Sequence, residues 1–432
     1  MTRTLIISHS HPQLKDGGGE VAAYRQFAHM REIGMDVHFL GAAYDPALAN
    51  TLFPGGQRMV ALGRNDYIFR TAPMDIYTLE QPSVEDEDGL LRILLRYDAD
   101  IYHFHHFWNI GAGVIRRLRK AKPDARLVCT LHEFMAICIN DGQMIKRGTK
   151  QLCREAGPVA CALCFPNHSP VNFLVRQRSM LEMLECFDLL ICPSQFLADR
   201  FIAWGAPADR IRVLENGMAS DFDHTGPDQM GLDRDGERSA GSSRRFAFFG
   251  QATPTKGLNI LVRAARWLHN HDPELDFSID VYGVTEDRFR ELCPEEELIK
   301  DIIRFHGRYA ATDVVGLMQA NGWLIVPSTW WENSPVVIQE ARLAGTPVIA
   351  SNIGGMREKV TGWGRLFPVG DFEALGRLIE ELAGNDSALE EACGQIVQPL
   401  SIAEYLALWQ REVAGLDMRP TMESQADASS QS

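Results

Sequence analysis

The sequence predicts an α/β protein built from two doubly wound parallel sheets. Short apolar segments alternate with amphipathic, helix-like segments through most of the 432 residues, and this alternation is typical of βαβ units. The length is about three times that of an average domain, which excludes one small core. A polar, glycine-rich stretch at residues 225–243 separates two halves that both show the alternation. We therefore expect two Rossmann-like domains joined by a flexible linker.

The N-terminal half, residues 1–224, is expected to form the first domain. A helix at Glu20–Ile33 follows a glycine run and ends at a glycine, which is a common stop signal. A helix at Val171–Phe187 follows Ser169 and Pro170, a capping serine with proline at the first helical position. The predicted strands are short apolar runs at Thr4–Ser8, Asp36–Gly41, Asp100–Phe104, Arg126–Leu131, Leu189–Pro193 and Arg210–Leu214.

Residues 244–400 repeat the pattern and are expected to form the second domain. Residues 401–418 have the periodicity of an amphipathic helix that could cross back to the first domain. Residues 419–432 form a polar tail that is expected to be disordered. The predicted strands are Phe246–Phe249, Phe277–Tyr282, Ile303–His306, Trp323–Pro327 and Pro347–Ala350, with helices at Leu258–His271 and from Pro335 onward.

The composition excludes several classes of protein. A hydrophobic content of 45% and a net charge of −14 argue against a disordered chain and against a dedicated nucleic-acid binder. No apolar run approaches the roughly 18 residues that a spanning helix needs, and the N-terminal apolar stretch is too short for a secretion signal. The nine cysteines are dilute and odd in number, which favours reduced thiols. We therefore expect a cytoplasmic protein without a membrane-spanning segment or a nucleic-acid partner.

The loop after the predicted strand Trp323–Pro327 carries two acidic residues in a suggestive arrangement. Glu332 lies before a predicted helix and Glu340 inside it, with Ser334 as a candidate N-cap and Pro335 as a candidate first helical residue. Free backbone amides at such a helix start can bind an anion. At about 1.5 Å of rise per residue, the two carboxylates should lie about 10 Å apart or more, too far for a retaining glycosidase pair. They are better placed to hold two ends of one long ligand, although two solvated acids are the alternative.

The segment VPSTWWENSPVVIQEA at residues 326–341 resembles the signature of the retaining GT-B glycosyltransferases of family four, and so do GTPVIA at 345–350 and GGMRE at 354–358. The resemblance is strong from residue 248 to residue 358 and looser before it. It implies the GT-B fold, in which two Rossmann-like domains face each other across a cleft. It also implies transfer of a hexose, with retention, from a nucleotide diphosphate sugar to a saccharide or lipid-linked acceptor in polysaccharide or glycoconjugate biosynthesis.

The same resemblance implies roles for individual residues. The first glutamate of the family's motif contacts the transferred sugar and the second binds ribose hydroxyls, which gives these roles to Glu332 and Glu340. The residues implied at the donor beside them are Asn333, Ser334, Pro335 and Val336.

The segment FFGQATPTKG at residues 248–257 is similar to the family's Gly-Arg-x(4)-Lys-Gly loop, whose two cations hold the donor diphosphate. Lys256 matches the lysine, whereas Gln251 stands where arginine is usual, so one positive charge is missing. The resemblance implies that transfer needs no metal or other cofactor, because Lys256 and helix amides would stabilise the leaving diphosphate. A solvated loop lysine is the alternative.

Two N-terminal segments match the family near the reacting sugar. Gly17, Gly18 and Gly19 follow the first strand as in the family's Gly-Gly loop, and His132 ends a strand where the family has its active-site histidine. The alternatives are a flexible turn and a buried structural histidine. Further histidines occupy positions 103, 105 and 106, where strand alternation puts 103 and 105 on one face and 106 on the other. Cleft lining or packing is a better expectation for these three than a metal site.

Four cysteines fall in an unusually long insertion at about residues 134–168. A tetrahedral thiolate site for structural zinc needs four such ligands, and a metal would explain how the insertion stays ordered. Reduced thiols or a redox pair are the alternatives. The cysteines are Cys138, Cys153, Cys161 and Cys164.

A basic run on a predicted helix contains Arg116, Arg117, Arg119 and Lys120. Lipid-linked acceptors lie at anionic membrane surfaces, so this helix is a candidate for peripheral docking at the inner face of a membrane. A solvated helix face is the alternative.

Three functions stay open at this point. The first is a retaining hexosyltransferase. The second is a non-catalytic subunit that binds nucleotide sugars, which the glutamine at position 251 favours. The third, with little support, is a GT-B epimerase or hydrolase.

Overall fold

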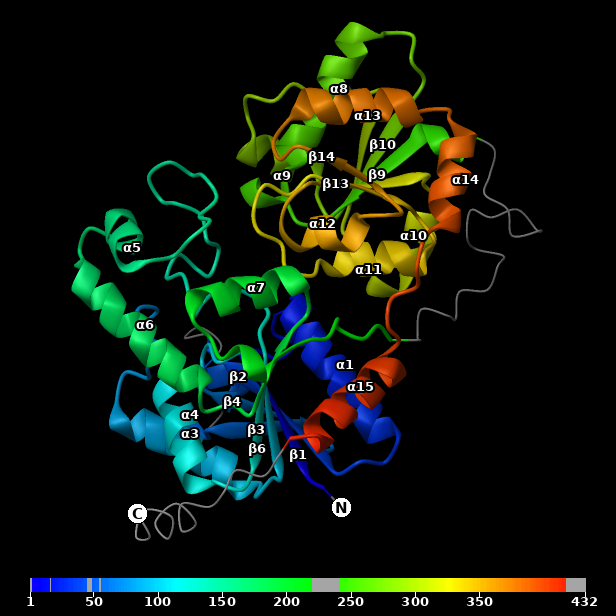
Figure 1. The fold of residues 1–432 in the computed structure, drawn as a ribbon. Helices are drawn as coiled ribbons and strands as arrows, with labels where there is room; N and C mark the ends of the chain where they lie inside the picture. The colour runs from blue at the N-terminus through cyan, green and yellow to red at the C-terminus, as the bar shows by residue number, and fades with distance from the viewer. Residues whose placement is uncertain (1, 16, 45–48, 54–55, 220–240, 417–432) are drawn as a thin grey trace. The chain divides into compact units, whose positions relative to one another are not determined.

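The computed structural model describes residues 2–15, 17–44, 49–53, 56–219 and 241–416. The chain divides into two compact units, of which the first comprises Met1–Met218 with Leu400–Ser432 and the second Ala219–Pro399. Each unit is built on one sheet with helices packed on it (Figure 1). The predicted linker lies largely outside the described residues, and so does the predicted tail.

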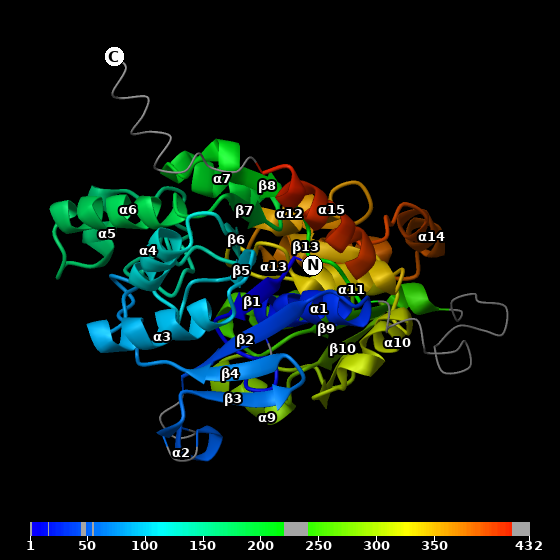
Figure 2. The ribbon, with the colours of Figure 1, turned by 90° about the horizontal axis from the view of Figure 1, so that it is seen from below.

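The N-terminal unit contains an eight-stranded sheet with the order β3-β4-β2-β1-β5-β6-β7-β8. All neighbouring strands are parallel except β3 and β4, which form an antiparallel hairpin at one edge (Figure 2). This hairpin was not predicted, because β3 is largely exposed and lacks a buried apolar pattern. The strands are β1 (Thr4–Ser8), β2 (Val37–Ala43), β3 (Met59–Gly63), β4 (Asp66–Arg70), β5 (Ile101–His105), β6 (Arg126–Thr130), β7 (Leu189–Cys192) and β8 (Ile211–Val213).

Helices connect these strands as expected of a doubly wound sheet. The capping box predicted at Ser169 is confirmed, since its hydroxyl accepts from the backbone of Asn172 and Pro170 is the first helical residue. The helices are α1 (Gly18–Glu32), α2 (Ala49–Leu52), α3 (Val84–Arg96), α4 (Ala112–Ala121), α5 (Pro158–Cys164), α6 (Pro170–Leu184), α7 (Gln195–Trp204) and α15 (Ile402–Ala414).

The C-terminal unit contains a six-stranded parallel sheet with the order β11-β10-β9-β12-β13-β14. Its strands are β9 (Arg245–Phe249), β10 (Ser278–Tyr282), β11 (Ile303–Gly307), β12 (Trp323–Val326), β13 (Val348–Ser351) and β14 (Arg365–Phe367). Its helices are α8 (Leu258–His271), α9 (Glu286–Leu292), α10 (Val314–Gln319), α11 (Val336–Leu343), α12 (Gly354–Val360), α13 (Phe372–Leu382) and α14 (Asp386–Gly394). The prediction of two parallel-sheet α/β domains is confirmed.

Helix α15 completes the core of the N-terminal unit although it comes last in the chain. Trp409 and Tyr405 are almost fully buried against Phe27 of α1 and Ile6 of β1. Met218 forms a β-bridge with Ser401, so the chain leaves this unit and re-enters it at adjacent positions. Burying two such aromatic side chains contributes several kcal/mol, on the order of 1.5–3 kcal/mol for each. No described helix is both long enough and apolar enough to span a bilayer.

Candidate active site

The loops after β9 and β12 bring two predicted site residues of the C-terminal unit into contact. The strands are neighbours in the sheet, and Thr329 N donates a hydrogen bond of 2.8 Å to Thr255 O between the loops. Lys256 Nζ lies 2.6 Å from Glu332 Oε1. Gln251 is exposed in the loop after β9. The sequence predicts separate roles for Lys256 and Glu332, whereas the structure pairs them in one charge network.

Glu332 is held as a buried carboxylate anion. Its Oε1 also accepts hydrogen bonds from Ser328 Oγ at 3.0 Å and from Trp330 Nε1 at 2.8 Å. Burial by itself raises the pKa of Glu332, but the Lys256 ammonium and the three hydrogen bonds outweigh burial, so the pKa lies below its ordinary value. Glu332 is therefore suited to accepting hydrogen bonds from a ligand and not to donating a proton.

Two glycines allow backbone segments to approach the loop between β12 and α11 closely. A Cβ at Gly355 would lie 1.5 Å from the carbonyl oxygen of Asn333, and one at Gly257 would lie 1.9 Å from that of Pro327. Gly257 also has a φ of +73°, which side chains disfavour. Gly355 N donates a 2.8 Å hydrogen bond to Glu332 O. The lack of a side chain at these two positions thus permits the close backbone packing around the Lys256–Glu332 pair.

Helix α11 starts one residue later than predicted. Pro335 is the N-cap, with extended backbone, and the buried Oγ of Ser334 has no hydrogen-bond partner among the described residues. The expectation that Ser334 caps the helix is wrong, because an extended Pro335 moves Ser334 one residue too far from the first-turn amides. Val336 opens the helix and Glu340 is its fifth residue. Asn333 is buried in the loop.

In the N-terminal unit, the predicted glycine loop lies against the predicted histidine. Gly17 is the N-cap of α1 and Gly18 its first residue, so the helix begins two residues before the predicted Glu20. A Cβ at Gly19 would lie 3.2 Å from the ring of His132. The structure therefore brings together the glycine run after β1 and the histidine that follows β6.

His132 belongs to a hydrogen-bonded chain of neutral side chains. His105 Nε2 lies 2.9 Å from Gln26 Oε1, and His105 Nδ1 lies 3.2 Å from His132 Nε2. With the amide oxygen of Gln26 as acceptor, His105 carries its proton on Nε2 and its Nδ1 accepts from His132 Nε2. Burial, together with neighbouring histidines, lowers the pKa of His132 to about 3. His132 is therefore neutral near pH 7.

A buried carboxylate beside this chain was not predicted as a site residue. Glu20, in the first turn of α1, pairs with His9 Nε2 at 2.9 Å and lies 4.0 Å from Lys15 Nζ. Burial raises the pKa of Glu20, but the hydrogen bond and charge of His9 and the charge of Lys15 bring it down to about 2. The sequence position of Glu20 and His9 could have identified them, because both residues flank the carboxyl end of β1, and open sheets bind ligands at that edge.

A second carboxylate, Glu133, has the opposite character. Its carboxylate contacts Nε2 of His106. The other ring nitrogen of His106, Nδ1, accepts hydrogen bonds from the backbone amides of Phe107 at 2.9 Å and Trp108 at 2.7 Å. His106 therefore carries its proton on Nε2 and donates it to Glu133. Burial raises the pKa of Glu133 to about 8, even though His9, a backbone hydrogen bond and Arg176 oppose the rise.

Replacing Glu133 by glutamine is expected to flatten the decline of stability with pH. The pKa of Glu133 rises from 4.5 to about 8 on folding, so its contribution is fully present below about pH 4.5 and is lost as pH rises through about 8. Glutamine releases no proton and should remove this loss. The midpoint of thermal unfolding, measured from pH 6 to 9, should fall less in E133Q than in the wild type. An exposed control, E182Q, should follow the wild type, and parallel profiles for E133Q and the wild type would contradict the assignment.

The remaining histidine of the run, His103, is structural. Its Nε2 lies 2.9 Å from Thr130 Oγ1, and its ring stacks on that of Trp409 with 5.5 Å between centroids. The ring of His105 lies 4.3 Å from that of His103, which confirms that the two share a face. Packing therefore accounts for His103.

The four cysteines predicted to bind zinc are neighbours in the structure. Electrostatic interactions link the Cys161 thiol with those of Cys138, Cys153 and Cys164, and burial raises the pKa of Cys161 to about 11. In the described parts of the chain, no group of three or more His, Cys, Asp or Glu side chains is arranged to hold a metal ion. Structural zinc therefore stays a prediction.

Metal analysis of the purified protein tests that prediction. No residue from 145 to 168 is buried, so this segment, which includes helix α5, has no core of its own. A bound zinc ion would therefore contribute much of its stability. We expect about one zinc ion per chain by elemental analysis and a loss of that zinc in C161S/C164S. Less than about one zinc per three chains after purification without chelators would rule the site out.

Three arginines of the basic helix α4 form ion pairs within their own unit. Lys120 is exposed. Acidic side chains of α3 and of neighbouring segments pair with the three arginines. A peripheral location at a membrane therefore stays a prediction. The pairs are Arg116 with Glu80, Arg117 with Asp88, and Arg119 with Asp188.

Solved structures share this fold over almost the whole chain. The structure of Anabaena Alr3699/HepE in complex with UDP and glucose matches with a TM-score of 0.64 and 19% identity, covering 96% of this chain and 100% of the other. Sucrose-phosphate synthase from Thermosynechococcus elongatus matches with a TM-score of 0.65 and 16% identity, covering 99% and 100%. These similarities show the GT-B fold.

Relatives known by sequence align over part of their length. The chain is 29% identical over 188 residues to the D-inositol 3-phosphate glycosyltransferase of Corynebacterium glutamicum (strain R), which covers 40% of this chain and 43% of the relative. It is 25% identical over 210 residues to the amylovoran biosynthesis glycosyltransferase AmsK of Erwinia amylovora, which covers 46% and 48%. The chain thus spans about half the length of these relatives.

Two family models match the two halves of the chain in order. The model described as "Glycosyltransferase Family 4" matches residues 16–222, and the model described as "Glycosyl transferases group 1" matches residues 231–398. The first match contains the glycine loop and the histidine cluster, and the second contains the Lys256–Glu332 pair. Together with the fold, the two matches show that the chain belongs to the GT-B glycosyltransferases.

Proposed function

We propose that this chain is a retaining glycosyltransferase that moves a hexose from a nucleotide diphosphate sugar to a hydroxyl group of a saccharide or lipid-linked acceptor. The contact between Lys256 and Glu332 carries the proposal. It places a cation and a fixed anion at the carboxyl ends of adjacent parallel strands, where open sheets bind phosphorylated ligands. The UDP and glucose in the HepE structure support such a donor, and the amylovoran relative supports a role in polysaccharide synthesis.

In the proposed reaction, the bond between the sugar C1 and the diphosphate oxygen breaks, and negative charge grows on the leaving group. A bond forms between C1 and the acceptor hydroxyl oxygen, and the hydroxyl proton passes to the departing diphosphate. Lys256 is suited to stabilise that charge, and backbone amides at helix starts add partial positive charge without a metal ion. When the ammonium turns from Glu332 to the diphosphate, Glu332 Oε1 keeps its bonds from Ser328 and Trp330, and a sugar hydroxyl can take the place of Lys256 as a donor. Glu340, on α11, would bind the ribose hydroxyls at the other end of the donor.

The neutral state of His132 suits a place beside the sugar. The reacting carbon becomes positively charged as the leaving group departs, so a protonated imidazole would oppose the reaction by like-charge repulsion. The pKa of His132 of about 3 keeps the ring uncharged at neutral pH, and the ring can still form hydrogen bonds with hydroxyls.

Donor turnover with a panel of substrates tests the proposal. UDP-glucose and GDP-mannose are incubated with and without saccharide acceptors, with EDTA present, and free nucleotide and the anomeric configuration of the product are measured. We expect acceptor-dependent release and a retained configuration. Donor binding without turnover would instead indicate a nucleotide-sugar-binding subunit, and release without any acceptor would indicate a hydrolase or epimerase. An inverted product would overturn the retaining mechanism.

A further inference from the structure

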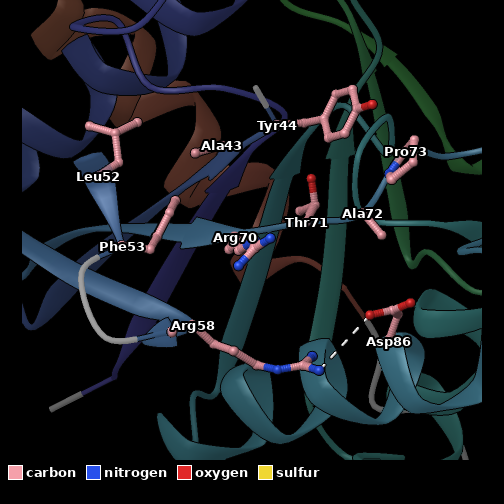
Figure 3. A pocket seen from close by; sticks show the side chains of 11 residues that line it. Ala43, Tyr44, Leu52, Phe53, Arg58, Arg70, Thr71, Ala72, Pro73 and Asp86 are labelled. Carbon is pink, nitrogen blue, oxygen red and sulfur yellow. Dashed lines mark ion pairs between the residues drawn. The ribbon is translucent and has the colours of Figure 1, made fainter. Parts of the chain in front are cut away.

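The N-terminal unit contains a cavity of about 530 Å³ whose lining includes none of the residues assigned to the donor. It begins where β2 and β4 end, since Ala43 and Arg70 are register partners on these strands and both line it. Figure 3 shows its walls, which come from the ends of β2 and β4, from the residues that follow α2, and from the first turn of α3. The cavity therefore lies at the carboxyl edge of the sheet, where doubly wound domains bind ligands.

Two arginines line this cavity, and so does the carboxylate of Asp86. Arg70 N donates a 2.8 Å hydrogen bond to Arg58 O across the β3–β4 hairpin, and both side chains line the cavity. Arg58 lies 3.9 Å from Asp86, whose other carboxylate oxygen accepts from Ser83 Oγ. Among the described residues, Arg70 has no carboxylate partner. Arg70 therefore brings a positive charge to the cavity wall that no carboxylate of the described residues offsets, and an oxyanion could pair with it.

The cavity wall also contains a buried hydroxyl group without a partner. Thr71 is 7% exposed, and its Oγ1 makes no hydrogen bond within the described part of the chain. A buried hydroxyl without a partner is costly, on the order of 1–3 kcal/mol, and is uncommon in native proteins. In Figure 3 this hydroxyl points toward the side where Tyr44 lies. A polar ligand in the cavity would supply the missing partner.

Two aromatic side chains and a neighbouring loop complete the cavity. Tyr44, 43% exposed, and Phe53, 3% exposed, contribute apolar surface of the kind that contacts the face of a sugar ring. Ala43 and Phe53 belong to an apolar cluster that Leu14 of the β1–α1 loop packs against. The cavity wall is thus in contact with the loop that carries Lys15 and leads into the glycine run. A ligand in the cavity would lie beside that loop.

We propose that this cavity binds a sugar or cyclic polyol that carries one oxyanion, either a phosphate or a carboxylate. Arg70 and the Thr71 hydroxyl bind the oxyanion, the Arg58–Asp86 pair lines the cavity beside them, and Tyr44 contacts the ring. The volume accommodates a ligand about the size of one or two sugar units. The further identification of this ligand as the acceptor rests on the proposed function, and it makes the acceptor of this enzyme an acidic saccharide or polyol.

Calorimetric titration of the full-length protein tests the cavity directly. The probes are glucose 6-phosphate, glucuronate and neutral glucose. We expect both anions to bind more tightly than glucose and less tightly as salt rises from about 50 to 200 mM. The variant R70Q should weaken anion binding about ten- to hundredfold, because it removes one charge-assisted contact. Arg64, exposed in the turn of the same hairpin, provides the matched control, and R64Q should bind as the wild type does.

The variant T71V separates a ligand-binding role from a structural one. Valine has nearly the same shape, and no described residue loses a hydrogen bond, so the midpoint of thermal unfolding should not fall. Binding of the anions should nevertheless weaken about three- to tenfold. If R70Q and T71V bind both anions as R64Q does, or if glucose binds as tightly as the anions, the cavity proposal is wrong. Binding of glucose 6-phosphate alone would identify phosphate as the oxyanion, and binding of glucuronate alone would identify carboxylate.

Nucleotide binding to the same protein samples, measured as thermal stabilisation by UDP, separates the cavity proposal from the glycosyltransferase proposal. If UDP-sugars bind and transfer occurs but no anion binds the cavity, the glycosyltransferase proposal stands and the cavity proposal falls. If the anions bind and depend on Arg70 while no nucleotide sugar binds or reacts, the cavity is a binding site and the proposed reaction is wrong. Competition between acceptor and glucose 6-phosphate then tests whether the cavity holds the acceptor.

Discussion

The variant K256A is expected to lose about 100- to 1,000-fold in the rate of sugar transfer, because Lys256 supplies the charge that stabilises the leaving diphosphate. The kcat and KM for UDP-glucose and for GDP-mannose measure this loss. The exposed Lys300 of the C-terminal unit offers a matched control, and K300A should transfer at the rate of the wild type. A K256A enzyme with near-normal kcat on a donor that the wild type uses would contradict the role.

The same variant should also be less stable at neutral pH. Glu332 is buried, and without Lys256 its carboxylate keeps only neutral hydrogen-bond donors, a loss on the order of 1–3 kcal/mol. The pKa of Glu332 is lowered in the folded protein, so the stability that depends on Lys256 is present above the ordinary carboxyl pKa of 4.5 and is lost as pH falls through the lower folded value. Urea unfolding of K256A and of the wild type should therefore converge in acid.

A double variant separates charge from catalysis. In K256A/E332Q the buried carboxylate of Glu332 is replaced by a neutral amide, so this site holds no uncompensated charge. The free energy of unfolding at pH 7 should therefore return toward that of the wild type. Transfer should stay low, because neither charged group is present. If the double variant is no more stable than K256A, the uncompensated Glu332 carboxylate is not the cause of the destabilisation.

The variant G355A is expected to disrupt the site without touching any polar side chain. The added methyl group would lie 1.5 Å from Asn333 O, a distance that forces the loop carrying Glu332 to shift. Overpacking of this kind costs on the order of 1–3 kcal/mol, and misplacement of a binding group by about 1 Å can cost about 100-fold in rate.

Another helical glycine provides the control for this prediction. Gly394, at the end of α14, has nothing within 4 Å of the position that an added methyl group would take, and it has no positive φ. The variant G394A should match the wild type in activity and gain up to about 1 kcal/mol of stability. Thermal unfolding and donor affinity measured on both variants test the pair, and a G355A protein that behaves like G394A would show that the loop can move without cost.

The parallel sheets were predictable because each buried strand is an apolar run. The β3–β4 hairpin was missed because exposed Leu62 and its neighbours do not repeat an apolar period. The capping role of Ser334 was wrong because local sequence cannot reveal that Pro335 stays extended. Local sequence patterns thus predict a strand or helix well where one face or all of it is buried. They predict the residues at which helices begin and end less well.

The candidate site was predictable by residue but not by contact. The motifs pointed to Lys256 and Glu332 separately, whereas their ion pair joins positions that are 76 residues apart. The pairing of Glu20 with His9 and the neutralisation of the α4 arginines likewise depend on which strands and helices become neighbours. Such contacts follow from the tertiary fold, and no local spacing contains them.

Helix α15 sets the order in which the protein matures during synthesis. The ribosome must translate residues 219–399 after the N-terminal unit has emerged and before Trp409 exists to cover its core. At about 5–20 residues per second, that interval is roughly 10 to 40 s. During this time, Phe27 and Ile6 lack the contacts with α15 that help to bury them. The nascent chain would therefore expose an aggregation-prone apolar surface that chaperones can recognise.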